Sequence, residues 1–98
     1  MKIKEVSKTL GISEDELVKK GVKAYLEMEL RKVKAEIYGI FSKYKVGSFK
    51  ELDEKISSGE LSETETFEDF TKLDYLESKR EKIEKLLSGL DSNTIGSN

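Results

Sequence analysis

Carboxylates are the chemical groups that this sequence gathers most densely, and one tight group is formed by Glu65, Glu68 and Asp69. A di-metal site in a helical bundle combines such glutamates with a Glu-x-x-His motif on a facing helix. The sequence contains no histidine and no cysteine, which removes that motif, thiolate ligands and the commonest general base. Acidic residues at this place are more typical of a first helical turn, where they interact favourably with the helix dipole.

The residues that other catalytic sites require are also missing from the sequence. Hydroxyl side chains are common, but without histidine a Ser-His pair is excluded. The seven glycines stand alone, so no phosphate-binding loop is expected. A lysine-based site is not excluded by the sequence, although no feature points to one. We therefore expect no enzymatic activity, no metal and no cofactor.

The composition predicts a single domain with a thin core, because 36% of its 98 residues are apolar and 39% are charged. Abundant lysine and glutamate with few thermolabile side chains is typical of heat-adapted proteins. No apolar run approaches the ~20 residues of a membrane span, and nothing resembles a signal peptide. We therefore expect a cytoplasmic protein that does not contact a membrane.

The net charge of −2 conceals an asymmetry between the two halves of the chain. Residues 1–46 contain 11 basic and 7 acidic side chains, a balance of +4, whereas residues 47–98 contain 7 and 13, a balance of −6. The halves could complement each other when the chain folds back on itself. Alternatively, the basic half faces nucleic acid and the acidic half faces a basic partner.

A proline-free stretch from Ser13 to Lys45 predicts one long helix, about 13–46, around which the chain is built. Ser13 and Glu16 form a capping box at its start, and Gly47 is expected to provide a left-handed C-cap at its end. Apolar residues recur along it at heptad spacing and predict a seam for another helix. The predicted seam consists of Leu26, Leu30, Val33, Ile37, Ile40, Phe41 and Tyr44.

Upstream of this seam the same helix is apolar on more than one side, which predicts deeper burial. Gly21 is costly there, by about 1 kcal/mol relative to alanine. Together with Ala24 it leaves a shallow place where another helix could cross closely; the alternative is a glycine that is merely tolerated. Gly39 has no neighbour in the pattern that explains it.

The remaining segments predict an antiparallel hairpin of helices. Residues 1–12 are expected to form a short helix, or a strand-like entry followed by one turn. Capping boxes then predict a short connecting helix at about 49–58 and a returning helix at about 63–90. Residues 91–98 are polar and are expected to form a flexible tail.

The expected fold class is therefore all-α: a coiled-coil-like, antiparallel long-helix hairpin with a short connecting helix and a short N-terminal helix. Arg80 interrupts the heptad pattern of the returning helix. It should either set the register against a carboxylate or extend its stem out of the seam. Because a two-helix hairpin has a thin core, we expect two chains to pair across the seam as a homodimer.

The N-terminal motif Leu10-Gly11-Ile12-Ser13 is followed by Glu16-Leu17-Val18, Gly21-Val22 and Ala24-Tyr25-Leu26. In these residues the chain resembles the helical half of ribbon-helix-helix antitoxins. Met1–Thr9 is too short for that family's DNA-reading strand and full first helix. The resemblance therefore implies a dimerising helix pair more than DNA reading. A basic patch could still contact phosphates, although lysines on a solvated face are the default. The patch consists of Lys2, Lys4, Lys8, Lys19, Lys20 and Lys23.

A second set of motifs spans most of the chain: Lys43-Tyr44, Val46, Ser48-Phe49, Glu51-Leu52-Asp53, Ile56, Gly59-Glu60, Glu63, Glu68-Asp69-Phe70 and Leu73-Asp74-Tyr75-Leu76-Glu77. In these residues the chain is similar to small helical proteins of archaea and bacteria that look like the antitoxins of toxin–antitoxin modules. The resemblance implies a protein that binds and neutralises a cognate toxin.

An acidic-aromatic run is the candidate anchor for such a partner, since aromatic rings supply contact area and carboxylates suit a basic surface. It comprises Phe67, Glu68, Asp69, Phe70, Asp74 and Tyr75. The alternative is that Phe67 and Phe70 close the core of the hairpin. Two other functions stay open: a DNA-binding transcriptional regulator that uses the basic patch, and a structural coiled-coil adaptor.

Overall fold

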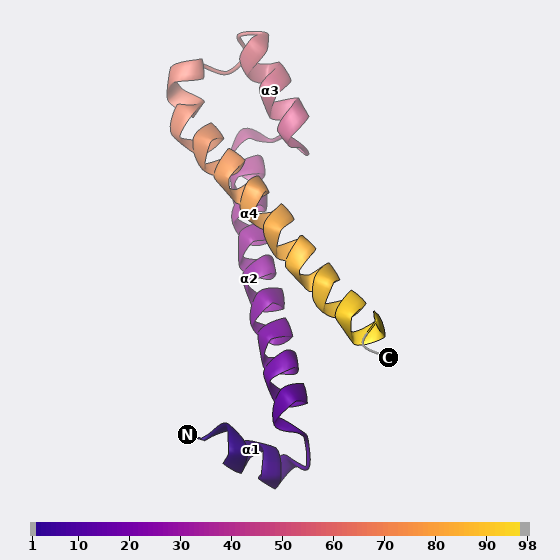
Figure 1. Ribbon diagram of the computed structural model, residues 1–98. Helices are drawn as coiled ribbons and strands as arrows, with labels where there is room; N and C mark the ends of the chain where they lie inside the picture. The colour runs from indigo at the N-terminus through magenta and orange to yellow at the C-terminus, as the bar shows by residue number, and fades with distance from the viewer. Residues whose placement is uncertain (1, 97–98) are drawn as a thin grey trace.

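The computed structural model describes the backbone of residues 2–96 and the side chains of residues 2–90. Within that part the chain forms four helices. They are α1 (Ile3–Leu10), α2 (Glu14–Tyr44), α3 (Phe49–Ser57) and α4 (Glu63–Gly96). The long helices α2 and α4 run antiparallel, and α3 joins them at one end (Figure 1). The prediction of an all-α hairpin with a short connecting helix and a short N-terminal helix is confirmed.

The molecule is elongated, with principal extents of 60 × 30 × 17 Å. Its radius of gyration is 19.4 Å, whereas a compact chain of about 100 residues has ~13 Å. In Figure 1, α4 crosses α2 and then diverges from it, so that the start of α2 and the end of α4 lie apart. None of the described helices is both long and apolar enough to cross a membrane.

Serine side chains begin three of the helices, as their capping patterns predict. The Oγ atoms of Ser13, Ser48 and Ser62 accept hydrogen bonds from backbone N–H groups three residues later, at 3.1, 3.1 and 3.3 Å. Each bond satisfies a donor that the first helical turn leaves free. Because these bonds are local, they fix where α2, α3 and α4 start.

The C-terminal cap of α2 differs from the prediction that placed it at Gly47. Lys45 takes the left-handed conformation, with φ 56°. The N–H of Val46 then donates to the carbonyl of Phe41 at 3.0 Å, which is the pattern of a Schellman motif. Val46 is buried, and its burial sets the position of the turn even though Lys45 has a side chain.

The core lies where α2, α3 and α4 meet. Leu52 of α3 and Leu73 of α4 are completely buried. The other buried apolar residues are Val33, Ile37, Ile40, Val46, Leu76 and Ile83. The core is thus a seam along half of α2, closed at one end by α3.

The first half of α2 is not buried, contrary to the prediction of deeper burial there. Val18, Val22 and Tyr25 are 48%, 44% and 58% exposed. The reason is the divergence of α4, because the first residue of α2 that packs against the core is Leu26. On α1, which contacts α2, the C-terminal cap is Gly11 in the left-handed conformation.

The last helix extends to Gly96, past the end expected near Leu90. The side chains of residues 91–98 lie outside the described part of the chain. The expectation of a flexible tail over 91–98 therefore stays a prediction.

Candidate protein-interaction surface

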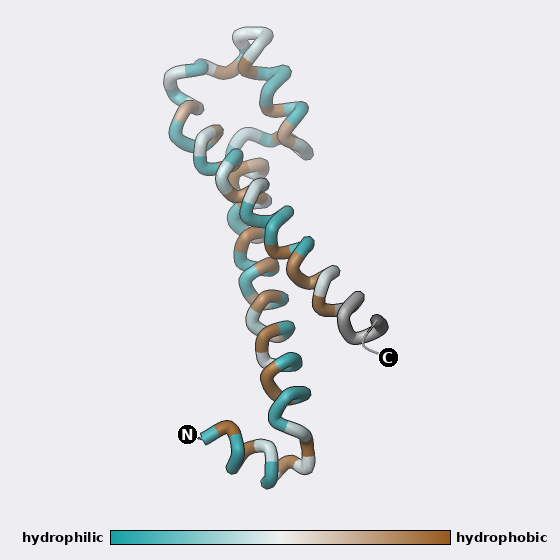
Figure 2. The backbone as a smooth tube through the Cα atoms, viewed as in Figure 1, coloured by the Kyte–Doolittle hydropathy of each residue, from teal (hydrophilic) through white to brown (hydrophobic). Residues whose placement is uncertain are grey.

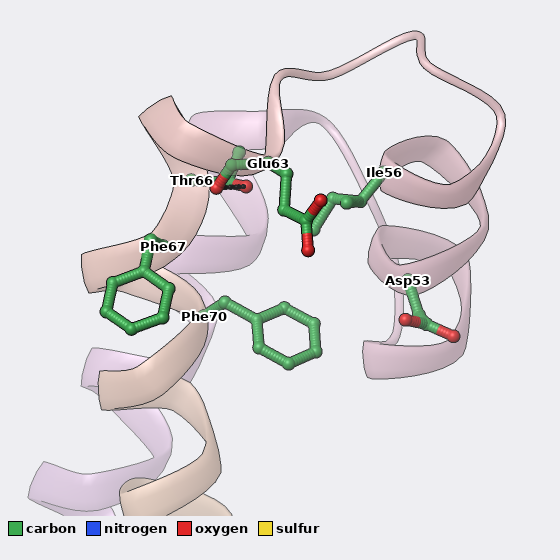
Figure 3. Close-up of a pocket in the computed structure, with 6 residues that line it drawn as sticks. All are labelled: Asp53, Ile56, Glu63, Thr66, Phe67 and Phe70. Carbon is green, nitrogen blue, oxygen red and sulfur yellow. Dashed lines mark hydrogen bonds between the residues drawn. The ribbon is translucent and has the colours of Figure 1, made fainter.

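A groove of about 280 Å³ lies between α3 and the first turns of α4. Its walls are the two helices whose first turns are capped by Ser48 and Ser62. Its apolar lining is Ile56, Phe67 and Phe70, and its polar lining is Asp53, Glu63 and Thr66. In Figure 3 the side chains of Ile56, Glu63 and Phe70 lie between the two helices, and Phe67 lies at the edge, on α4. We call these six residues the acidic groove.

The two phenylalanines of the acidic groove occupy different environments. The ring of Phe70 lies 4.8 Å from the ring of Phe49 at an interplanar angle of 51°, and it packs against the core. Phe67 is 65% exposed. The sequence left open whether these phenylalanines close the core or form an exposed anchor. In the structure Phe70 packs against the hairpin core, whereas Phe67 is exposed to solvent.

The polar atoms of the groove are also of two kinds. Thr66 is buried, and its hydroxyl donates to the carbonyl of Ser62 at 2.8 Å. Its only donor hydrogen is therefore already used within the helix. By contrast, no ion pair joins Asp53 or Glu63 to a cation within residues 2–90. Both carboxylates are available to a ligand.

The surroundings of the groove are strongly acidic. Residues 51–69 contain eight carboxylates and one lysine, and that lysine, Lys55, already pairs with Glu60 at 3.4 Å. A concentration of one sign of charge at a concave apolar site attracts ligands of the opposite sign. A ligand that fits here is therefore apolar and basic.

Asp69, one of the predicted anchors, is instead part of a contact within the chain. Its Oδ2 accepts hydrogen bonds from Lys43 Nζ and from the Tyr44 hydroxyl, each at 2.6 Å. The bond from Lys43, followed by that from Tyr44, lowers the pKa of Asp69. The pKa of Lys43 is raised, chiefly by the same bond. Burial is the main cause of the raised pKa of Tyr44.

The other predicted anchors are exposed on α4. Glu68 and Asp74 lie at the surface, and Tyr75 is 62% exposed. Of the six predicted anchors, Phe67 and Phe70 line the groove. The sequence analysis did not select Asp53, Ile56, Glu63 and Thr66 for the site. The sequence did contain one signal for them. Phe49, Leu52 and Ile56 form a short apolar face, which predicts that α3 packs against the phenylalanines of α4.

Comparison with known proteins places the chain in a family. The model of the "Uncharacterized protein MJ0235 family" matches residues 1–95. The chain belongs to the MJ0235 family. It is 34% identical over 73 residues to uncharacterized protein MJ0235 of Methanocaldococcus jannaschii, a match that covers 74% of this chain and 88% of that protein. No solved structure matches the chain. Neither name states an activity or a partner, so the antitoxin function stays a prediction for this MJ0235-family chain.

The predicted seam of this MJ0235-family chain is used within the hairpin. Val33, Ile37 and Ile40 are buried, and the other four seam residues pack against the core. Leu26, Leu30, Phe41 and Tyr44 are partly buried. Pairing of two chains across the seam stays a prediction, and most of the seam is used within the hairpin. The physical reason is that α4 already covers the seam.

Gly21 and Ala24, predicted to receive a crossing helix, are exposed. Apart from its own helical backbone, no described atom lies within 4 Å of the place where a Cβ at Gly21 would be. The same holds for Gly39. The close helix crossing predicted at Gly21 is therefore absent within the described chain.

The six lysines of the basic patch are all exposed, and Lys20 pairs with Glu16 at 3.6 Å. Contact with DNA stays a prediction. Arg80 is bound on its own helix, with both guanidinium contacts at 2.8 Å, to Glu77 and Glu84. It therefore does not set the register across the seam, because its partners lie three and four residues away.

Proposed function

We propose that this protein is a non-catalytic protein-binding module whose acidic groove receives a basic segment of a partner protein. The observation that carries the proposal is the placement of Phe67, a large apolar ring that is 65% exposed beside the groove. A large exposed ring beside apolar and acidic groups in a groove is the kind of side chain that anchors a partner.

The chemistry of the groove supports a ligand with both apolar and basic groups. Burying an exposed phenylalanine under a partner is worth about 1.5–3 kcal/mol. Asp53 and Glu63 lie beside it without an ion-pair partner in residues 2–90. Lysine or arginine from the partner would pair with them, which favours fast encounter and excludes acidic proteins.

A toxin protein is the partner that the antitoxin-like motifs suggest. A toxin that acts on nucleic acid needs a basic surface, and the negative charge of residues 51–69 suits a surface of that kind. In this proposal the antitoxin covers the toxin by direct contact. The antitoxin needs no catalytic activity of its own to do this.

Co-expression with the product of the adjacent gene tests the proposal. We expect a stable complex in size-exclusion chromatography with light scattering, and growth arrest when the neighbour is expressed alone. A neighbour that stays separate from this protein, or that is harmless alone, contradicts the toxin assignment.

Two matched variants test the groove itself. Phe67→Ala should weaken the complex about 30-fold or more, because a buried aromatic anchor contributes at least ~2 kcal/mol. Tyr38→Ala removes a comparable ring that is 69% exposed on α2, away from the groove, and should leave affinity unchanged. Equal effects of the two variants would remove the groove from the proposal.

A further inference from the structure

The start of the chain exposes apolar side chains that no other described element covers. We call α1 together with residues 14–32 of α2 the N-terminal arm. In Figure 2 hydrophobic residues recur along this arm, and α4 packs beside α2 only from about Leu26 onward. The exposed apolar residues are Ile3, Leu10, Val18, Val22, Tyr25 and Met28, between 38% and 68% accessible. Such an accumulation marks an interaction surface.

Four residues of α2 form a continuous line on this surface. Val18, Gly21, Tyr25 and Met28 are spaced three, four and three residues apart, which is the spacing of a helix–helix seam. We call these four residues the apolar stripe. It is separate from the seam that begins at Leu26 and packs against α4.

We propose that the apolar stripe binds the same stripe of a second copy of this chain, with the two α2 helices antiparallel and crossing near Lys23. In this register Tyr25 of one copy lies over Gly21 of the other, and the reciprocal contact forms by symmetry. The recess at Gly21 is open in the single chain. It accepts the exposed Tyr25 ring, while Val18 of one copy lies opposite Met28 of the other.

Charges at the ends of the stripe favour the same arrangement. Glu14 and Lys32 lie on the same side of α2 as the stripe, by helical spacing. The antiparallel register brings Glu14 of one copy next to Lys32 of the other at both ends. A parallel pair would instead place Glu14 against Glu14 and ring against ring, which is repulsive and crowded. Residues 1–32 contain eight basic and six acidic side chains, so two arms carry little net repulsion.

Disulfide cross-linking tests the register, because the chain has no cysteine of its own. Val18→Cys with Met28→Cys should give a covalent dimer on mild oxidation. The two positions are ~15 Å apart along one helix, so they cannot bond within a chain. Each single variant should stay uncross-linked. Lys20→Cys with Glu27→Cys, on another side of the helix, is the control for chance collisions.

The cross-linking outcomes separate the alternatives. A dimer from Val18→Cys alone would indicate a parallel pair and would overturn the proposed register. No covalent dimer from the double variant, or equal yield from the control pair, would overturn the proposal as a whole.

Sedimentation equilibrium of the full chain measures the association without cross-links. Gly21→Arg should weaken the dimer about a hundredfold or more, since it fills the recess twice per dimer. Gly39→Arg is the matched control, because Gly39 is an equally open helical glycine outside the stripe. Both variants should keep their helical circular dichroism, as glycine is the weaker helix former.

Three results would contradict self-association through the stripe. They are a wild-type chain that stays monomeric up to millimolar concentration, an equal effect of Gly21→Arg and Gly39→Arg, and a monomer whose complex with the neighbouring gene product is lost on Gly21→Arg. The last result would assign the stripe to the partner. Failure of the acidic groove in the Phe67→Ala test leaves this proposal intact, because the two surfaces share no residue.

Discussion

The hydroxyl of Tyr44, the last residue of α2, donates a 2.6 Å hydrogen bond to Oδ2 of Asp69 near the start of α4. Lys43 donates to the same oxygen at 2.6 Å, and its Nζ lies 5.4 Å from the centre of the Tyr44 ring. The contact joins the two long helices beside α3, where the chain reverses. It therefore links the two long helices at the closed end of the hairpin.

This contact predicts a loss of stability in acid. The pKa of Asp69 is lowered, first by the Lys43 hydrogen bond, so the folded state favours the carboxylate. The stabilisation is present above the ordinary aspartate pKa of about 4 and is lost as pH falls through the lowered folded value. Asp69→Asn should reduce the free energy of unfolding by about 1 kcal/mol at pH 7 and by much less at pH 2.5.

Urea unfolding at the two pH values measures this difference. Asp74→Asn, at an exposed position on the same helix, is the control and should change little at either pH. If Asp69→Asn has the same effect at pH 2.5 as at pH 7, the ionised carboxylate is not the stabilising group.

Replacement of Lys45 by glycine should stabilise the protein. Lys45 has φ 56°, a conformation that costs a residue with a Cβ about 1 kcal/mol relative to glycine. Lys45→Gly should therefore raise the free energy of unfolding by roughly 0.5–1 kcal/mol, after allowance for the more flexible unfolded chain. Thermal unfolding followed by circular dichroism is the measurement.

The matched control is Lys34→Gly, at an exposed position in the middle of α2. There glycine should lower stability by about 1 kcal/mol, because the helical conformation gains nothing from the loss of the side chain. We expect the two variants to change the free energy of unfolding in opposite directions. A destabilising effect of Lys45→Gly would count against the Schellman cap.

The two groove phenylalanines should respond differently to truncation. Phe70 is partly buried and packs against Phe49 and the core, so Phe70→Ala should cost about 2–3 kcal/mol. Phe67 is 65% exposed, so Phe67→Ala should stay within about 1 kcal/mol of the wild type. Denaturant titration of both variants measures this; large losses for both would show that Phe67 is needed for the fold.

Two leucines of α4 provide a test of the seam. Leu73 is completely buried, and Leu73→Ala should cost about 2–5 kcal/mol. Leu86 is 57% exposed on the same helix, and Leu86→Ala should cost less than about 1 kcal/mol. Comparable losses would mean that the exposed end of α4 is covered in solution, for instance by another chain.

Local features of this fold were predictable from the sequence because their causes are local. Ser13, Ser48 and Ser62 cap helices through bonds to residues three positions away. Heptad spacing likewise indicated the seam residues that pack in the core. The cap of α2 was misplaced at Gly47, because its position depends on the burial of Val46 and not on the conformational preference of glycine.

Only the tertiary structure decided which of these side chains are exposed and which are occupied by contacts within the chain. Asp69 looked available in the sequence, but Lys43 and Tyr44, more than 20 residues away, occupy it. The divergence of α4 leaves Val18 and Tyr25 exposed, whereas the pattern of α2 alone predicted their burial. Sequence spacing determines which side of a helix is apolar. Only the crossing of the helices decides how far along each helix that side is covered.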